Sequence, residues 1–220
     1  MPKTAILLGG SGAVGSELLQ LLLADNRYEK IKLFARSSIN VRDTKIEEHL
    51  VNLFELENYA DVFTGDEVYC CIGTTKAKTP DKKTYHAIDY GIPVAAAKLA
   101  ADNGIETYVV VSAIGADADS SVFYNRTKGE MQEAVLAENI HKVHLLQPSL
   151  ILAERKDNRI VEKIAEGFMW VINPLLFGDA AKYKSIKAAT IAKAMLWLAN
   201  NHYRETIVTS DKIEAIGIKS

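Results

Sequence analysis

Residues 5–23, AILLGGSGAVGSELLQLLL, carry four glycines between two apolar segments. The first segment is short and continuous, as expected for a strand that is buried on both faces, and the second has the apolar spacing of an amphipathic helix. The glycines at positions 9, 10, 12 and 15 fit G-x-x-G-x-x-G and G-x-G-x-x-G. A glycine-rich turn between a strand and a helix is typical of the first unit of an open α/β sheet.

This strand–turn–helix context predicts a dinucleotide site. The early glycines permit a tight turn, Gly12 lets backbone N–H groups approach a pyrophosphate, and Gly15 lets the helix pack closely on the strand. The helix N-terminus then stabilises the negative charge of the phosphates. A glycine-rich turn without a ligand is the alternative that these residues leave open.

The remaining chain repeats the same alternation. Continuous apolar runs predict strands at residues 4–8, 31–35, 48–52, 67–72, 107–112, 143–147 and 206–209. Helices are expected at residues 12–24, 56–63, 93–104, 120–139, 160–172 and 188–200. We therefore expect an α/β fold, a doubly wound parallel sheet (Rossmann fold), in a single domain over residues 1–220. Residues 153–220 are expected to contribute a small C-terminal cap or substrate region.

The end of the second expected strand bears on which dinucleotide binds. In IKLFARSS (31–38), Arg36 stands where NAD-binding proteins carry an acidic residue that holds the ribose 2′-hydroxyl. A guanidinium pairs with a 2′-phosphate through two hydrogen bonds, whereas a carboxylate would repel it. The segment therefore predicts NADP(H), and a solvated surface arginine is the alternative.

The composition excludes several functional classes. With 48% hydrophobic and 25% charged residues and a formal net charge of −2, the chain resembles ordinary globular proteins, and nothing favours binding to nucleic acid or a membrane. No segment has the roughly 20 apolar residues of a membrane span, and no secretion signal is expected. Adjacent Cys70 and Cys71 are expected to be reduced in a cytoplasmic protein. The scattered histidines predict no metal site.

Three tyrosines are followed by a lysine four residues later: Tyr28–Lys32, Tyr124–Lys128 and Tyr183–Lys187. Such a pair can transfer a proton in a carbonyl reductase, because a nearby ammonium lowers the pKa of the phenol from about 10. Tyr124 and Lys128 share one face of an expected helix, and Ser112 ends an expected strand upstream. This context, rather than the spacing, selects Tyr124.

These elements, in this order, resemble the short-chain dehydrogenase/reductase superfamily in its atypical NAD(P)-binding branch. A closer likeness is to the HIV-Tat-interacting-protein-like oxidoreductases. It rests on GGSGAVG (9–15), LFARS (33–37), VNLFELENYADVF (51–63), CCIGTTKAK (70–78), VVSAIGAD (110–117), FYNRTKGEMQ (123–132) and LQPSLIL (146–152).

The resemblance implies an NADPH-binding protein, monomeric or a loose homodimer, that acts on a small-molecule substrate. By position it implies a cofactor-binding set of Gly9, Ser11, Gly12, Ala13, Val14 and Gly15 at the pyrophosphate, Arg36, Ser37, Ile72 and Gly73 at the adenosine side, and Tyr124, Lys128, Ile151 and Arg159 at the nicotinamide side. Arg36 and Ser37 would meet the 2′-phosphate. Two positions depart from the family pattern: Asn52 replaces a frequent acidic residue, and QPS (147–149) replaces a more usual R-P-G.

An NADPH-dependent oxidoreductase of short-chain type is therefore expected. Tyr124 would deliver a proton, Lys128 would lower the pKa of Tyr124 and bind the nicotinamide ribose, and Ser112 would orient a substrate carbonyl. Two alternatives stay open: a non-catalytic NADPH-binding regulator, and a nucleotide-sugar epimerase or dehydratase, for which the cap is short. The lysines of TTKAKTPDKK (74–83) either favour an anionic substrate or form a solvated loop.

Overall fold

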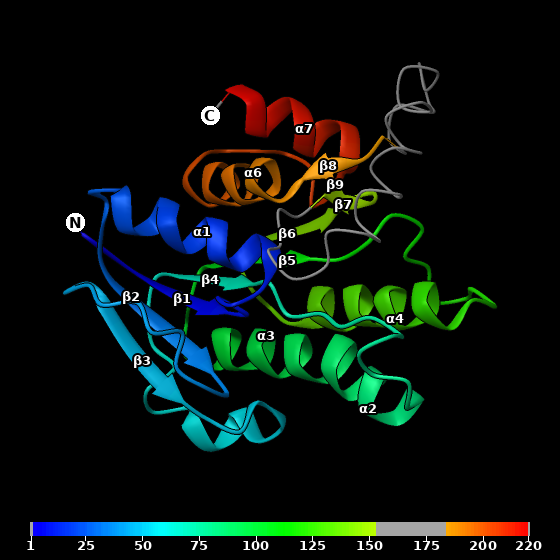
Figure 1. Ribbon diagram of the computed structural model, residues 1–220, viewed down its shortest axis with the longest axis horizontal. Coiled ribbons are helices and arrows are strands. Elements are labelled where there is room, and N and C mark those ends of the chain that lie inside the picture. The colour runs from blue at the N-terminus through cyan, green and yellow to red at the C-terminus, as the bar shows by residue number, and fades with distance from the viewer. Residues whose placement is uncertain (1, 153–183, 220) are drawn as a thin grey trace.

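A computed structural model describes residues 2–152 and 184–219. Within these ranges, a seven-stranded parallel sheet lies between two layers of helices (Figure 1). Its strand order is β3-β2-β1-β4-β5-β6-β9. The bounds are β1 (Lys3–Leu8), β2 (Tyr28–Ala35), β3 (Ile46–Leu50), β4 (Glu67–Cys70), β5 (Thr107–Val111), β6 (Lys142–Gln147) and β9 (Ile207–Thr209). The expected doubly wound Rossmann fold is confirmed.

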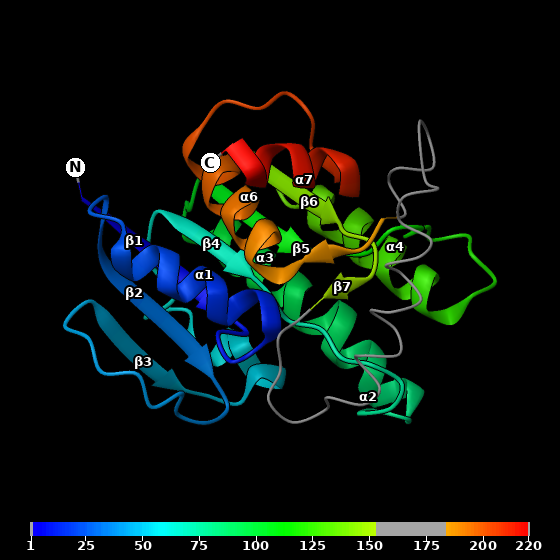
Figure 2. The same cartoon turned by 45° about the horizontal axis from the view of Figure 1, so that its top comes forward.

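One helical layer consists of α1 (Ala13–Ala24), α6 (Ala188–Asn200) and α7 (Ser210–Lys219). Figure 2 shows α1 and α6 side by side on this face, where they make extensive mutual contact. The opposite layer consists of η1 (Leu53–Tyr59), α2 (Lys82–His86), η2 (Ala87–Gly91), α3 (Ile92–Asp102) and α4 (Phe123–Ala137). A short second sheet pairs β7 (Ile151–Leu152) with β8 (Ile186–Lys187).

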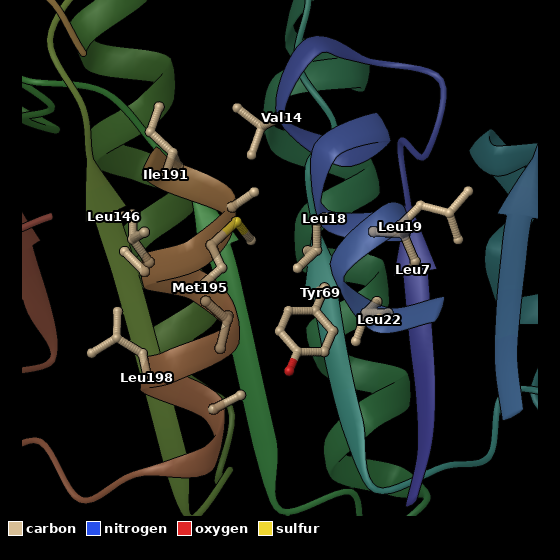
Figure 3. Close-up of a cluster of buried hydrophobic side chains, with 14 of the residues drawn as sticks. Leu7, Val14, Leu18, Leu19, Leu22, Tyr69, Leu146, Ile191, Met195 and Leu198 are labelled. Atoms are coloured by element: carbon tan, nitrogen blue, oxygen red, sulfur yellow. The ribbon is translucent and has the colours of Figure 1, made fainter. Parts of the chain in front are cut away.

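The core beneath α1 and α6 follows from helical spacing. Leu18 and Leu22 of α1, and Met195 of α6, are fully buried against Tyr69 of β4 (Figure 3). Apolar residues three or four positions apart form one stripe on a helix, and burying each such side chain contributes about 2 kcal/mol. This packing holds α1 against the sheet and so orients the glycine turn at its N-terminus.

Three elements differ from the sequence-based expectations: β3 and η1 at their ends, and α2, which the sequence analysis did not expect. The strand β3 begins two residues before the expected 48–52, because this edge strand is half-buried and lacks a continuous apolar run. The 3₁₀ helix η1 begins before residue 56, because the Asn52 side chain caps it by accepting a hydrogen bond from the Phe54 N–H, at 3.2 Å. Similarly, α2 begins at Lys82 because Asp81 accepts from the Thr84 N–H.

The described part of the expected cap, residues 184–219, extends the sheet. The strand β9 pairs with β6, and α6 packs between α1 and α7. The helix α7 was not expected from the sequence. The division of the chain at residue 153 stays a prediction, and the helix expected at 160–172 lies outside the described residues.

Tyr28, one of the three tyrosines followed by a lysine four residues later, has a structural role in a buried hydrogen-bond network. It lies in β2, and its hydroxyl donates to the buried carboxylate of Glu67 at 2.6 Å, as does the hydroxyl of Tyr69. Lys3 Nζ contacts the same carboxylate at 2.5 Å, and Asn200 at the end of α6 donates to the Tyr28 hydroxyl. This buried network ties α6 to the amino-terminal edge of the sheet, away from the glycine turn.

Two further expectations concern the redox state of the cysteines and membrane-spanning segments. Cys70 and Cys71 are free thiols, and burial raises the pKa of both. Within residues 2–152 and 184–219, no helix is long and apolar enough to cross a membrane. Tyr183, the third tyrosine followed by a lysine four residues later, lies outside the described residues.

Candidate functional site

The turn between β1 and α1 requires glycine at two positions. Gly9 has φ +81°, and a Cβ there would lie 2.7 Å from the carbonyl carbon and oxygen of Cys71. A Cβ on Gly15 would lie far inside van der Waals distance of the Gly9 carbonyl oxygen. The Gly12 N–H donates to that same oxygen at 2.9 Å. The turn is therefore packed against both β4 and the first turn of α1, with no room for side chains.

The N-terminus of α1 is available to an anion. Its capping residue is Gly12, which has no side chain to occupy the helix N–H groups, and no acidic residue lies in the first turn. Ala13 and Val14 open the helix, and the Val14 side chain is buried in the core, so these two residues offer their backbone to a ligand. Unpaired N–H groups and the helix dipole favour bound phosphate at such a position.

A cleft of about 350 Å³ opens directly in front of this turn. It lies where the strand order reverses between β1 and β4, which is the usual ligand position in open α/β sheets. Seven residues of the expected cofactor set line it: Gly9, Ser11, Gly12, Arg36, Ser37, Ile72 and Gly73. The structure thus gathers three separate segments of the chain around one cleft.

The adenosine side of the cleft has an exposed cation. Arg36 directly follows β2 and is exposed at the cleft wall, next to Ser37. Within the described ranges, no carboxylate forms an ion pair with its guanidinium. An unpaired guanidinium in this place suits an anionic group of the ligand.

Phe54 and Lys78 also line the cleft, and the sequence analysis did not assign either to it. Phe54 is 49% exposed on η1 and offers an aromatic face to the cleft. Asn52, one of the two departures from the family pattern, caps η1 through the Phe54 N–H and so helps to hold this ring in place. The sequence signal for Phe54 is an aromatic residue shortly after an expected strand. Lys78 belongs to the lysine-rich segment TTKAKTPDKK (74–83).

The three expected catalytic residues lie at the carboxyl ends of the strands and on α4. Ser112 directly follows β5 and is 4% exposed. Tyr124 and Lys128 lie four residues apart in α4, so they share a face of this helix. Lys128 is buried at 3% exposure, whereas Tyr124 is 39% exposed.

Asp89 is a site residue that the sequence analysis missed. It lies in η2 with 1% exposure, and its Oδ1 forms an ion pair with Lys128 Nζ at 2.8 Å. Its Oδ2 accepts a hydrogen bond from the Thr74 N–H at 2.8 Å. A Cβ on Gly73 would lie 3.5 Å from Asp89 Oδ1 and 3.9 Å from Lys128 Nζ. Gly73 therefore joins the cleft to the buried ion pair.

The ion pair changes the expected electrostatics of Tyr124. Burial, and then the Asp89 carboxylate, raise the pKa of Tyr124 to about 12. The expectation that Lys128 lowers this pKa is wrong for this structure, because the Lys128 charge is offset by Asp89 at 2.8 Å. Tyr124 is therefore a protonated phenol at neutral pH, as a proton donor must be.

The other expected residues lie apart from the cleft wall. Ile151 is half-buried in β7, where it pairs with Ile186 of β8 and packs on the core beneath α1. Arg159 lies outside the described residues. Tyr124 and Lys128 do not line the cleft itself; Gly73, which does, lies beside Lys128 and its partner Asp89.

Comparison with known proteins gives the family. A family model described as NAD(P)H-binding matches residues 9–172, which include the glycine turn, the cleft and α4. The chain belongs to this NAD(P)H-binding family. It is 28% identical over 198 residues to Protein HTATIP2 of Rattus norvegicus, covering 88% of this chain and 80% of that protein. It is 30% identical over 182 residues to Protein FMP52-1, mitochondrial, of Scheffersomyces stipitis, covering 79% and 80%.

Solved structures with the same fold have low sequence identity to this chain. A UDP-N-acetylglucosamine 4-epimerase from Methanobrevibacter ruminantium M1, in complex with UDP-N-acetylmuramic acid, superposes with a TM-score of 0.70 at 15% identity and covers 94% of this chain and 76% of that one. MoeE5 in complex with UDP-glucose and NAD gives 0.67 at 14% identity, covering 98% and 81%. At these identities the similarity shows the fold alone.

The family comparison confirms the resemblance that the sequence motifs indicated. It overturns the expectation of a cytoplasmic protein, because the FMP52 relatives from several fungi are named mitochondrial. That expectation rested on two reduced cysteines and the lack of a secretion signal, and neither observation separates the cytoplasm from other reducing compartments.

Gly15→Ala is expected to weaken binding of NADPH and to destabilise the fold by about 1–3 kcal/mol, because the new methyl group must displace the Gly9 carbonyl. Calorimetric titration with NADPH and thermal unfolding would measure both effects. Gly91→Ala is the matched control, since a Cβ there would meet nothing within 4 Å. Equal behaviour of the two variants would contradict the close packing of the turn.

Asp89→Asn is expected to lower the pKa of Tyr124 from about 12, because the carboxylate that disfavours the phenolate is removed and the Lys128 ammonium is left unpaired. A carbon-13 NMR titration of labelled tyrosine, with Tyr124 assigned by Tyr124→Phe, would follow the ring directly. The phenolate should then appear at lower pH in Asp89→Asn than in the unmodified protein. Asp102→Asn, at an exposed site, should leave the titration unchanged; an unchanged titration in Asp89→Asn would refute the electrostatic coupling.

Proposed function

We propose that this protein is an NADPH-dependent oxidoreductase of short-chain dehydrogenase/reductase type that acts on a carbonyl or alcohol substrate. The observation that carries the proposal is the position of Gly73, which lines the dinucleotide cleft and lies against the Lys128–Asp89 pair. This position supports the proposal because the cleft then lies beside Lys128, which shares a helical face with the proposed proton donor Tyr124.

The described residues fit a nicotinamide dinucleotide. The side-chain-free turn at Gly9 and Gly12 and the uncapped N-terminus of α1 suit a pyrophosphate. Arg36 supplies a cation and Phe54 an aromatic face at the opposite end of the cleft. When bound, the reduced nicotinamide supplies the hydride that the protein itself cannot provide.

The chain's own groups would hold the substrate and move the proton. Tyr124 is 39% exposed as a residue, and its hydroxyl is protonated at neutral pH and can donate to an oxygen that gains negative charge. Lys128, held by Asp89, lies on the same helical face as Tyr124. The Ser112 hydroxyl at the end of β5 would orient the same oxygen.

A second candidate is an NADPH-binding regulator without turnover. It is supported by the internal pairing of Lys128 with Asp89, which leaves the expected catalytic lysine without its usual effect on Tyr124. Under this alternative, Asp89 and Lys128 would change the conformation of the loop at Thr74 when the cofactor binds, and they would not assist a chemical step. Turnover assays separate the two candidates.

Arg36→Ala is expected to weaken binding of NADPH by about tenfold to a hundredfold while leaving binding of NADH nearly unchanged, because charge-assisted hydrogen bonds to the 2′-phosphate contribute about 1.5–3 kcal/mol. Calorimetric titration with both cofactors would measure the two dissociation constants. Arg42→Ala, an exposed arginine in the loop after β2, is the control. Equal losses for NADPH and NADH would exclude a role for Arg36 in selecting the 2′-phosphate.

Tyr124→Phe is expected to reduce oxidation of NADPH by about a hundredfold or more, because the proton donor is lost, while binding of NADPH stays unchanged. The substrates to assay with NADPH are aldehydes and ketones. UDP-glucose is assayed with NADP⁺ in the oxidising direction, because it has no free carbonyl group to reduce and because solved structures with this fold bind it. Tyr203→Phe, in the loop between α6 and β9, is the control. Turnover by the unmodified protein that survives in Tyr124→Phe would remove Tyr124 from the mechanism, and no turnover on any substrate would favour the regulator.

A further inference from the structure

The catalytic face of α4 continues beyond Lys128. Tyr124, Lys128 and Gln132 are spaced at intervals of four residues, so they form one stripe along the helix. The Gln132 side chain is 6% exposed, which is uncommon for glutamine unless its amide is hydrogen-bonded. The sequence pair Tyr124–Lys128 is thus part of a longer polar stripe, and its Gln132 end contacts residues at the ends of β5 and β6.

Gln132 is hydrogen-bonded at both ends of its amide. Its Nε2 donates to Ser112 Oγ at 2.5 Å, and its Oε1 accepts from Gln147 Nε2 at 3.1 Å. Ser112 ends β5 and Gln147 ends β6, and the two strands are adjacent. The bonds therefore run in one direction, from Gln147 through Gln132 to Ser112.

The direction of this chain determines what Ser112 can offer a ligand. A serine hydroxyl has one proton and two lone pairs. Because Gln132 occupies a lone pair of Ser112 Oγ, the proton cannot point at Gln132 and is left for another acceptor. The chain also polarises the hydroxyl, since each donor in a series strengthens the next.

We propose that Gln132 and Gln147 are positioning residues that fix the Ser112 hydroxyl as a hydrogen-bond donor, so that its subsite takes an acceptor oxygen, such as the carbonyl oxygen of an aldehyde or ketone. This inference rests on the proposed oxidoreductase function. An oxygen that gains negative charge during reduction accepts more strongly from a fixed donor. The subsite therefore suits the carbonyl form of the substrate, whose oxygen accepts a hydrogen bond, better than a group that donates a hydrogen bond.

Both glutamine side chains are uncharged, and their proposed positioning role depends on this. Gln147 is the first residue of the QPS departure from the family pattern, and the structure gives it a partner in Gln132. A carboxylate at position 132 would accept the Ser112 proton and reverse the hydroxyl. An apolar side chain there would leave the hydroxyl free to rotate. Only an amide with its nitrogen toward Ser112 both fills the lone pair and keeps charge out of this buried position.

Nitrogen-15 NMR of the side-chain amides tests the direction without any turnover. The Gln132 NH₂ signal, assigned by its loss in Gln132→Met, should shift strongly in Ser112→Ala, and the Gln147 NH₂ signal should shift in Gln132→Met. If the amides are reversed, Gln132 donates to Gln147 instead, and its NH₂ signal would respond to Gln147→Met rather than to Ser112→Ala. That second pattern would overturn the proposal.

Turnover kinetics with NADPH and para-nitrobenzaldehyde test the functional consequence. Gln132→Met and Gln132→Glu are both expected to lower kcat by about tenfold to a hundredfold, the range seen when supporting partners of an active group are removed, with the dissociation constant of NADPH unchanged. Gln20→Met, the same change on the exposed face of α1, is the control for the substitution itself. A kcat for Gln132→Glu equal to that of the unmodified protein would overturn the proposal, because a reversed Ser112 hydroxyl should not be tolerated.

The two arms separate failure of this inference from failure of the proposed function. If the unmodified protein reduces no carbonyl compound, the oxidoreductase function fails and no carbonyl substrate remains for the Ser112 subsite, whereas the amide signals still report which way the hydroxyl points. If turnover occurs but the amide signals follow the reversed pattern, the oxidoreductase function stands and the positioning role of Gln132 and Gln147 fails.

Discussion

The close approach of α1 to the Gly9 carbonyl is the constraint on which the rest of the site depends. Side chains are excluded at Gly9 by the Cys71 carbonyl of β4 and at Gly15 by the Gly9 carbonyl. The helix must therefore start directly at the end of β1, with its N-terminus facing the gap where the strand order reverses. The apolar stripe on α1, packed against α6 and the sheet, holds this geometry. The cleft exists because backbone, and not side chains, forms this wall.

The buried carboxylate of Asp89 connects that cleft to Lys128, one of the residues proposed for proton transfer. Asp89 accepts from the Thr74 N–H on one side and pairs with Lys128 on the other. Burying two charges has a large desolvation cost, which is offset when the pair is close and the remaining oxygen is also hydrogen-bonded, as it is here. A conformational change at the Thr74 loop must therefore alter the surroundings of Lys128, which is the physical basis for both the catalytic and the regulatory hypothesis.

The features of the fold and site that could be predicted from the sequence are those determined by residues close together in the chain. The central strands were predicted nearly to the residue, because strands such as β1 and β5 are buried on both faces and appear as continuous apolar runs. The edge strand β3 and the helix η1 were displaced, since partial burial and the Asn52 cap determine their ends. Asp89 was missed because an aspartate in an apolar stretch gives no indication of its partner, which lies on a different helix.

The sequence by itself determined the fold class, the family and the turn, because the glycines, the strand and the helix are adjacent in the chain and their sterics act locally. It also predicted that Tyr124 and Lys128 share a face of one helix, because their spacing is a property of that helix. The tertiary structure decided what surrounds these residues: burial, and then Asp89, raise the pKa of Tyr124, and Gln132 donates a hydrogen bond to Ser112. These effects depend on distances between segments that are far apart in the chain, and the electrostatic and hydrogen-bonding energies at the site follow those distances.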